Sequence, residues 1–383
     1  MLAHSPPLPL VIDYTHRDIS AEDEEAILLA LAQRNRVRRI RFNLPVRQLQ
    51  KLITAIDGEY PILEYLVLWD LFEDKNTVLT LPETLETPHL RHLAINCSIP
   101  IRFQLLTTAL GLVTLHLALY HPSTYFHPTL LLQSLSLMPQ LEIFLLFFYL
   151  NIPNRDDMER NITHVTLPNL RSFLFQADST YSETVLSQIT APRLEHFQIC
   201  YLKQLTVSVP ELLQFMGRTE SLRFDRAEFC FYSERVFVEV NLPKAKTYAF
   251  SINVECWHLD WQVSSVAQIF NALSQIFSAV EHLTLVHKAH RRSSEEHDGV
   301  DRTEWRKLLR SFSNVKTLEI EGGLAVRQLF RCLRLEDGED PLGLLPELQE
   351  LRYSDSSNVD DDALIPFVDA RQNAGRPVTL IEW

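Results

Sequence analysis

The chain has 383 residues, a formal net charge of −13 at pH 7 and 46% hydrophobic residues. A negative charge of this size opposes non-specific attraction to nucleic acids and to anionic membrane surfaces. Nine glycines in a chain of this length argue against glycine-rich nucleotide-binding loops. A compact protein of this length would need two domains or more, whereas a repeat protein grows in one dimension.

The first predicted elements alternate between strand and helix. Residues 8–14 are expected to form a strand, and a helix is expected to begin at Ser20, because Asp23 and Glu24 suit a helix N-terminus. A second strand is predicted at 37–42, with a second helix opening at Pro45. The predicted buried positions of the two helices are Ile27, Leu28 and Leu31 in the first, and Leu49, Leu52, Ile53 and Ile56 in the second. Gly58 is expected to end the second helix in the left-handed conformation.

The same alternation continues to the end of the chain. Further helices are predicted at residues 129–137, 183–189, 211–216, 264–277 and 301–310. The helix at 264–277 has the strongest apolar stripe, which contains Val266, Ile269, Phe270, Leu273 and Phe277. A last strand is predicted at 377–383.

A repeated motif, Leu-x-x-Leu-x-Leu with aliphatic or aromatic substitutes, organises this alternation. Five copies follow a proline, and they read PNLRSFLF at 168–175, PHLRHLAI at 88–95, PQLEIFLL at 139–146, PRLEHFQI at 192–199 and PELQELRY at 346–353. The first motif positions are Val37, Leu63, Leu90, Leu112, Leu141, Leu170, Leu194, Thr219, Ala245, Val280, Val315 and Leu348. The period ranges from 22 residues (Leu90 to Leu112) to 35 residues (Ala245 to Val280).

The motif predicts a short strand that enters from a bend. Its last two apolar positions alternate with polar ones and therefore share one strand face, while the first position lies in the bend. A single strand of this kind cannot bury its apolar face, but stacked copies in a parallel sheet can. We therefore predict an α/β leucine-rich-repeat solenoid, with a curved parallel sheet on the concave side and helices on the convex side. It is expected to be one irregular domain over residues 1–383, capped by residues 1–36 and by the strand at 377–383.

The cysteines and the termini indicate where the protein resides. Five cysteines lie far apart and form no Cys-x-x-Cys pair, which favours reduced thiols over a disulfide framework. The N-terminus has no signal-peptide pattern, and the most apolar stretch, 141–150, is too short to span a bilayer. We expect an intracellular protein of the cytoplasm or nucleus, with no membrane and no nucleic acid among its partners.

Motifs for catalysis and metal binding are lacking in the sequence. The 14 histidines form no His-Glu-x-x-His or Cys/His cluster, and there is neither a Gly-x-Ser-x-Gly motif nor a phosphate-binding loop. We therefore expect no catalytic, cofactor-binding or metal site, and no enzyme activity. The alternative of an enzyme hidden in a degenerate repeat array would require a deep polar pocket with converging titratable groups.

The outward positions of the strands are the candidate functional surface. The candidate partner-binding residues on the concave face are Tyr65, Val67, Arg91, His92, Val113, His116, Ile143, Leu145, Arg171, Leu174, His196 and Gln198. Val113, Ile143, Leu145 and Leu174 are expected to line up on consecutive strands as an apolar patch rimmed by charges. Such a patch favours an unidentified protein target as partner. The alternative is that a loop or a terminal segment of the chain covers it.

The proline-preceded strands, the opening PPLPLVIDY at 6–14 and the segment WHLDWQVSS at 257–265 together resemble the F-box/leucine-rich-repeat family of mushroom-forming fungi. The resemblance covers nearly the full chain. It implies the substrate-recognition subunit of a cullin-type ubiquitin ligase, in which the repeats bind a target and an N-terminal F-box binds the ligase adaptor.

The sequence departs from the family because no F-box precedes the repeats. If the gene model lacks an upstream F-box, the adaptor of a cullin ubiquitin ligase is an expected partner. Otherwise the chain is a leucine-rich-repeat scaffold with no ubiquitin-ligase role.

Overall fold

The computed structural model describes residues 8–71, 77–97, 99, 103–121, 125, 127–149, 164–202, 209–219, 224–241, 248–288, 302–322, 329–335, 338–354 and 364–382. The chain divides into two compact units. The first unit contains Met1–Ala177 and Thr184–Leu194, and the second contains Asp178–Glu183 and Glu195–Trp383. Both combine helices with strands of a mostly parallel sheet, so the predicted α/β class is confirmed. Residues 1–7 of the predicted N-terminal cap and Trp383 lie outside the described residues.

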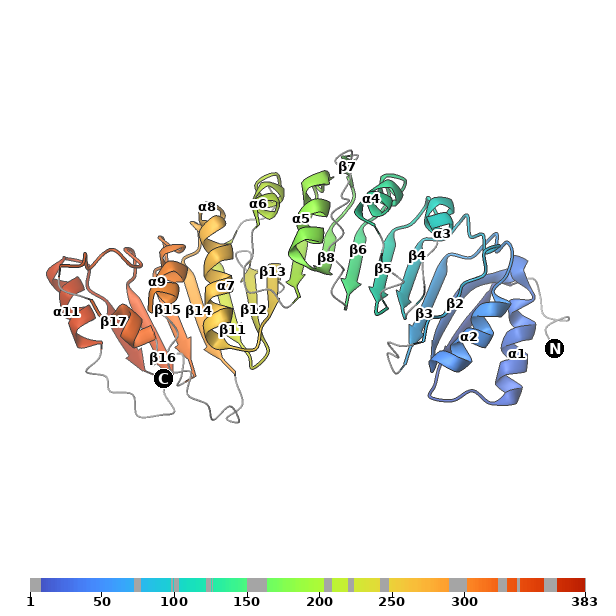
Figure 1. Cartoon of the computed structure of the whole chain (residues 1–383), viewed down its shortest axis with the longest axis horizontal. Coiled ribbons are helices and arrows are strands. Elements are labelled where there is room, and N and C mark those ends of the chain that lie inside the picture. Colours follow the sequence, from blue (N-terminus) through green and yellow to red (C-terminus); the bar gives the residue numbers. More distant parts are fainter. Residues whose placement is uncertain are drawn as a thin grey trace. The chain divides into compact units, whose positions relative to one another are not determined.

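The sheet of the first unit is parallel and follows the chain order (Figure 1). Its strands are β1 (Leu10–Thr15), β2 (Val37–Leu44), β3 (Tyr65–Asp70), β4 (His92–Asn96), β5 (Thr114–Leu119), β6 (Ile143–Phe148) and β8 (Ser172–Ala177). Its helices are α1 (Ala21–Leu31), the 3-10 helix η2 (Arg34–Arg36), α2 (Val46–Ala55), α3 (Phe103–Thr108) and α4 (Pro128–Ser136). Two short strands, β7 (Val165–Thr166) and β9 (Ile189–Thr190), form a separate parallel pair.

The motif positions in this unit are buried as the pattern predicts. The bend residues Leu63, Leu90, Leu112, Leu141 and Leu170 are fully buried, as are the two apolar residues that follow each of them in the strands. Each strand therefore presents one buried face, and the intervening residues point to the opposite face. The sequence pattern correctly located the strands because burial alternates with period two.

The first two helices largely match expectation. Ser20 is the N-cap of α1 and its side chain accepts a hydrogen bond from the Asp23 N–H at 3.1 Å. Ile27 and Leu31 are buried, but Leu28 is 38% exposed, so its predicted burial is wrong. Leu28 lies about 100° around the helix from Ile27, and only one stripe of α1 faces the core. Gly58 has the predicted positive φ, 77°, but α2 ends at Ala55 with Ile56 as its C-cap, so the expectation that Gly58 ends this helix is wrong.

The second unit departs from the expected order of strands. Its strands, in spatial order, are β10 (His196–Tyr201), β13 (Tyr248–Glu255), β12 (Arg235–Asn241), β11 (Arg226–Phe231), β14 (His282–His287), β15 (Thr317–Glu321), β16 (Glu350–Ser354) and β17 (Thr379–Glu382). Strand β12 is antiparallel to both of its neighbours, β11 and β13. The expectation of an uninterrupted parallel series is wrong at this point, whereas the final strand is confirmed as β17.

The inverted strand has a local cause. A tight turn joins β11 to β12, in which the Tyr232 N–H donates to the Arg235 carbonyl at 2.8 Å. Val236, Val238 and Val240 then alternate with less buried residues and are themselves fully buried. This apolar alternation is present in the sequence, but it does not match the Leu-x-x-Leu-x-Leu motif and was therefore not predicted as a strand.

Helices of the second unit bury the predicted stripes. They are α6 (Pro210–Gly217), α7 (Leu259–Ala272), α8 (Ser274–Phe277), α9 (Arg302–Arg310) and α11 (Ile365–Asn373), while α5 (Ser179–Gln188) carries residues of both units. The helix predicted at 264–277 is divided into α7 and α8 at Leu273, and all five of its predicted stripe residues are buried. Phe270 and Phe277 lie 4.7 Å apart, centroid to centroid, within an aromatic core.

The segment at 257–265 forms the start of α7. Gln262 is almost fully buried, and its side-chain amide donates to the carbonyls of Tyr232 and Cys256, both at 2.8 Å. The Gln262 side chain therefore connects α7 by a hydrogen bond to the turn between β11 and β12. Trp257 and Trp261 remain exposed, at 65% and 42%.

Candidate protein-binding surface

The face of the first unit's sheet opposite the buried leucines carries three rows of side chains, which we call the open face. Strand register brings together Arg39, Tyr65, His92, Thr114, Ile143 and Ser172 in the first row. The second row contains Arg41, Val67, Ala94, His116, Leu145 and Leu174, and the third contains Asn43, Trp69, Asn96, Ala118, Phe147 and Gln176.

Ten of the twelve predicted residues belong to this unit, in two settings. Seven lie on the open face: Tyr65, Val67, His92, His116, Ile143, Leu145 and Leu174. Arg91, Val113 and Arg171 instead lie one residue before their strands begin. Val67 is only 5% exposed, so it supports its neighbours and offers little contact area.

The predicted line of Val113, Ile143, Leu145 and Leu174 is partly wrong. Leu145 and Leu174 are register partners, and Ile143 lies in the adjoining row. Val113 lies outside these rows because β5 begins at Thr114, and its N–H donates to the Arg91 carbonyl at 2.8 Å instead. The apolar patch therefore consists of Ile143, Leu145 and Leu174.

Aromatic side chains extend this patch toward the ends of the strands. The rings of Trp69 and Phe147 lie 6.2 and 5.5 Å from the ring of His116, centroid to centroid. Tyr149 follows Phe147 at 6.2 Å and is 40% exposed. These three aromatic residues were not predicted because they lie beyond the last position of the motif, although the same alternation continues through them.

Burial favours the uncharged form of the two histidines on the open face. Burial lowers the pKa of His116 below its usual 6.5. Burial, with a smaller effect of the Arg91 charge, also lowers the pKa of His92. Near neutral pH both rings therefore act as polar, uncharged contact groups.

A row of mostly charged residues lies where the strands begin. Backbone hydrogen bonds of 2.8 to 2.9 Å connect Arg38, Glu64, Arg91, Val113, Glu142 and Arg171 in this order. Arg38 and Glu64 form an ion pair, with Nε and Oε2 2.9 Å apart. Within the described residues, no ion pair engages Arg91 or Glu142, and both side chains are exposed.

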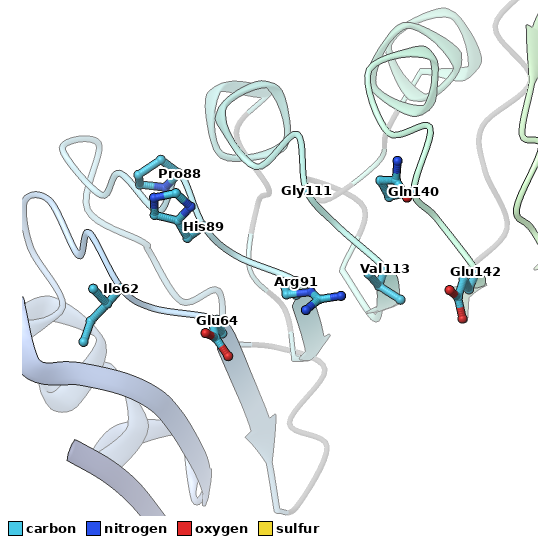
Figure 2. A pocket seen from close by; sticks show the side chains of 9 residues that line it. All are labelled: Ile62, Glu64, Pro88, His89, Arg91, Gly111, Val113, Gln140 and Glu142. Atoms are coloured by element: carbon cyan, nitrogen blue, oxygen red, sulfur yellow. The ribbon is translucent and has the colours of Figure 1, made fainter. Parts of the chain in front are cut away.

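Part of this row borders a shallow groove of about 520 Å³, which we call the strand-start groove (Figure 2). It is lined by Ile62, Glu64, Pro88, His89, Arg91, Gly111, Val113, Gln140 and Glu142. Figure 2 shows Arg91 and Glu142 on either side of Val113. The groove thus combines an apolar centre at Val113 with three charged residues, of which Glu64 is paired with Arg38.

The last two predicted residues, His196 and Gln198, lie on β10 of the second unit. His196 Nδ1 lies 2.9 Å from the Tyr248 carbonyl oxygen, and the Tyr248 hydroxyl donates to Gln198 Oε1 at 3.4 Å. Both side chains are half-buried and are engaged with β13.

One carboxyl group titrates near neutral pH. Burial raises the pKa of Glu183 from 4.5 to about 7, although two backbone N–H groups partly oppose the shift. These donors are the N–H groups of Glu211 and Leu212, at 2.6 and 3.3 Å. Glu183 therefore accepts hydrogen bonds from backbone N–H groups that have no partner within the first turn of α6. The perturbed pKa therefore has a structural explanation.

In the described parts of the chain, no three His, Cys, Asp or Glu side chains are grouped so that they could hold a metal ion. No helix there has the length and apolar character needed to cross a membrane. All five cysteines are free and buried.

No protein-family model and no curated protein sequence matches this chain.

Proposed function

We propose that the chain is a non-catalytic protein-recognition module built as a leucine-rich-repeat solenoid. The observation that most directly supports this proposal is the apolar patch of Ile143, Leu145 and Leu174 on the open face. Three apolar side chains that share neighbouring rows and keep part of their surface accessible are typical of a protein contact site.

The surroundings of the patch support a protein ligand. Aromatic residues, which contribute most to protein interfaces, adjoin it through Phe147 and Trp69. Arg39 lies on the same face, with its guanidinium carbon 4.2 Å from the centre of the Tyr65 ring. An apolar centre with a polar and charged margin suits recognition of a folded partner.

The repeat architecture is supported by the buried bend leucines and the register of the parallel strands. In its most specific form, the proposal is the target-recognition part of an F-box protein that acts in a cullin-type ubiquitin ligase. This form rests on the sequence resemblance, and the alternative is a leucine-rich-repeat scaffold without a ligase role.

A quantitative pull-down from an extract of the source cells tests the proposal. The bait is the full chain, compared with a Leu145→Gln/Leu174→Gln variant and with Leu29→Gln, which changes a leucine that is 57% exposed on α1. We expect a reproducible partner with the unchanged chain and with Leu29→Gln, and at least a tenfold loss with the double variant.

Two other outcomes would decide between the forms. Recovery of the ligase adaptor and cullin with the bait would support the ligase form, and a partner without the adaptor would support the scaffold. Equal recovery of the partner by the double variant, with its melting temperature unchanged, would contradict recognition by the open face.

A further inference from the structure

The strand-start groove carries two opposite charges that no other described group neutralises. Arg91 and Glu142 are both exposed and lie two strands apart, at the starts of β4 and β6, with Val113 between them at the start of β5. Unlike Arg38 and Glu64, which are paired at 2.9 Å, these two groups remain available to a ligand. The groove therefore fits a ligand that offers an anion, an apolar group and a cation in that order.

The spacing of the strands limits the shape of such a ligand. Neighbouring strands lie about 4.8 Å apart, so Arg91 and Glu142 start from positions roughly 10 Å apart. Along an α-helix, residues i and i+7 are about 10.5 Å apart and residues i+3 and i+4 lie between them on the same face. In an extended segment, same-face residues recur about every 6.8 Å, which does not match successive strands.

We propose that the strand-start groove binds an α-helix of a protein partner that lies across the strand starts. Its acidic residue contacts Arg91, an apolar residue one turn away contacts Val113, and a basic residue two turns away contacts Glu142. This inference rests on the proposed function, because it specifies which kind of segment of the recognised protein contacts the chain.

The wall of the groove offers a way to close it. A Cβ added to Gly111 would meet only the Leu90 carbonyl oxygen, at 3.8 Å, which is ordinary van der Waals contact. Because Gly111 lines the groove, Gly111→Leu adds side-chain volume at the groove wall. Gly217 provides a matched control, because a Cβ there has nothing within 4 Å and the residue lies in the other unit.

The test uses a displayed library of alanine-rich helical peptides in which positions i, i+3, i+4 and i+7 are randomised. The full chain is immobilised, and the selected sequences are compared between the unchanged chain and an Arg91→Glu/Glu142→Arg variant, which keeps the net charge. We expect opposite charges at i and i+7 in one order on the unchanged chain and in the reverse order on the variant. This comparison holds whichever direction the helix takes.

Two further arms make the result decisive. Gly111→Leu should lower the recovery of selected peptides at least tenfold, whereas Gly217→Leu should leave it unchanged, with melting temperatures confirming that both variants fold. A second library, interrupted by proline, should yield no such motif. The proposal is overturned if no charged pair is enriched, if its order does not reverse, or if the proline library yields the same motif. Partner capture that still depends on Leu145 and Leu174 would then leave the proposed function intact.

Discussion

The guanidinium of Arg371 donates a hydrogen bond to the carbonyl of Leu345 at 3.1 Å, and Leu345 has a positive φ of 48°. Arg371 is fully buried and lies on α11. The same guanidinium also donates to the carbonyls of Leu344, Pro346 and Leu348, at 3.1 to 3.3 Å. One side chain thus satisfies four carbonyls of the bend that precedes β16 and holds a backbone conformation that a leucine rarely adopts.

Replacing Arg371 by Met should destabilise the second unit. The substitution keeps most of the apolar stem but removes the four hydrogen bonds. The Leu345 carbonyl keeps the Leu348 N–H, at 3.0 Å, and each buried acceptor left without a partner costs about 1–3 kcal/mol. Allowing for water that reaches some of them, we expect a loss of roughly 3 kcal/mol or more in the free energy of unfolding. Urea denaturation measures it. The control is Arg352→Met, which removes an exposed ion pair with Glu350 and should cost less than about 1 kcal/mol. Equal effects of the two changes would refute the structural role of Arg371.

Glu183 should make stability depend on pH. Its pKa is raised from 4.5 to about 7 in the folded protein, so the folded state holds this proton more tightly than the unfolded state. The contribution of this group to stability is therefore present below pH 4.5 and is lost as the pH rises to about 7. Glu183→Gln cannot ionise, and the stability of the unchanged chain relative to this variant should fall across that pH interval.

The measurement is a series of urea denaturation curves from pH 4.5 to 8.5 for the unchanged chain, Glu183→Gln and Glu25→Gln. Glu25 is an exposed residue of α1 and serves as the control. Parallel curves for the unchanged chain and Glu183→Gln would show that Glu183 does not titrate in this interval.

The repeat register predicts which leucines support each unit. Leu170 is the bend residue before β8 in the first unit, and Leu283 is the first buried residue of β14 in the second. Alanine at either position should cost about 2–5 kcal/mol, because it removes a buried side chain and leaves a cavity. Leu29→Ala, at a position that is 57% exposed, should change the melting temperature little. An unchanged melting temperature for both core variants would refute the register.

The thiols should be unreactive in the folded protein. Burial raises the pKa of Cys200 and Cys332 to about 12 and that of Cys256 to about 11. It also raises the pKa of Cys230 to about 12 and that of Cys97 well above 9. At pH 8 a thiol with a pKa of 12 is ionised in roughly one molecule in ten thousand, and the thiolate is the reactive form. A thiol-reactive chromogenic reagent should therefore react quickly with none of the five cysteines in the native protein and with all five in guanidinium chloride. Rapid reaction of a native thiol would contradict its burial.

Much of the fold followed from local pattern. The strands at 37–42 and 377–383, the helix after Pro45 and the left-handed Gly58 were predicted because residue alternation and backbone preference act over a few neighbouring residues. The exposure of Leu28 was not predicted, because whether a helix flank is covered depends on which elements pack beside it. The candidate surface was predicted in part: Tyr65, His116 and Leu145 lie on the open face as expected, whereas Trp69 and Phe147 on the same face were missed.

The sequence by itself determined the repeat, the strand positions and the buried leucines, because a period-two pattern specifies which face of a strand is buried on folding. Only the tertiary structure decided that β13 pairs with β10 and β11 with β14, because these pairings join residues far apart in the sequence, such as Phe197 with Phe250 and Arg226 with His282. It also placed Val113 between Arg91 and Glu142, neither of which forms an ion pair with another described residue. Such relationships arise from register between strands that are 22 residues or more apart, for example from His92 to Thr114, and no local preference encodes them.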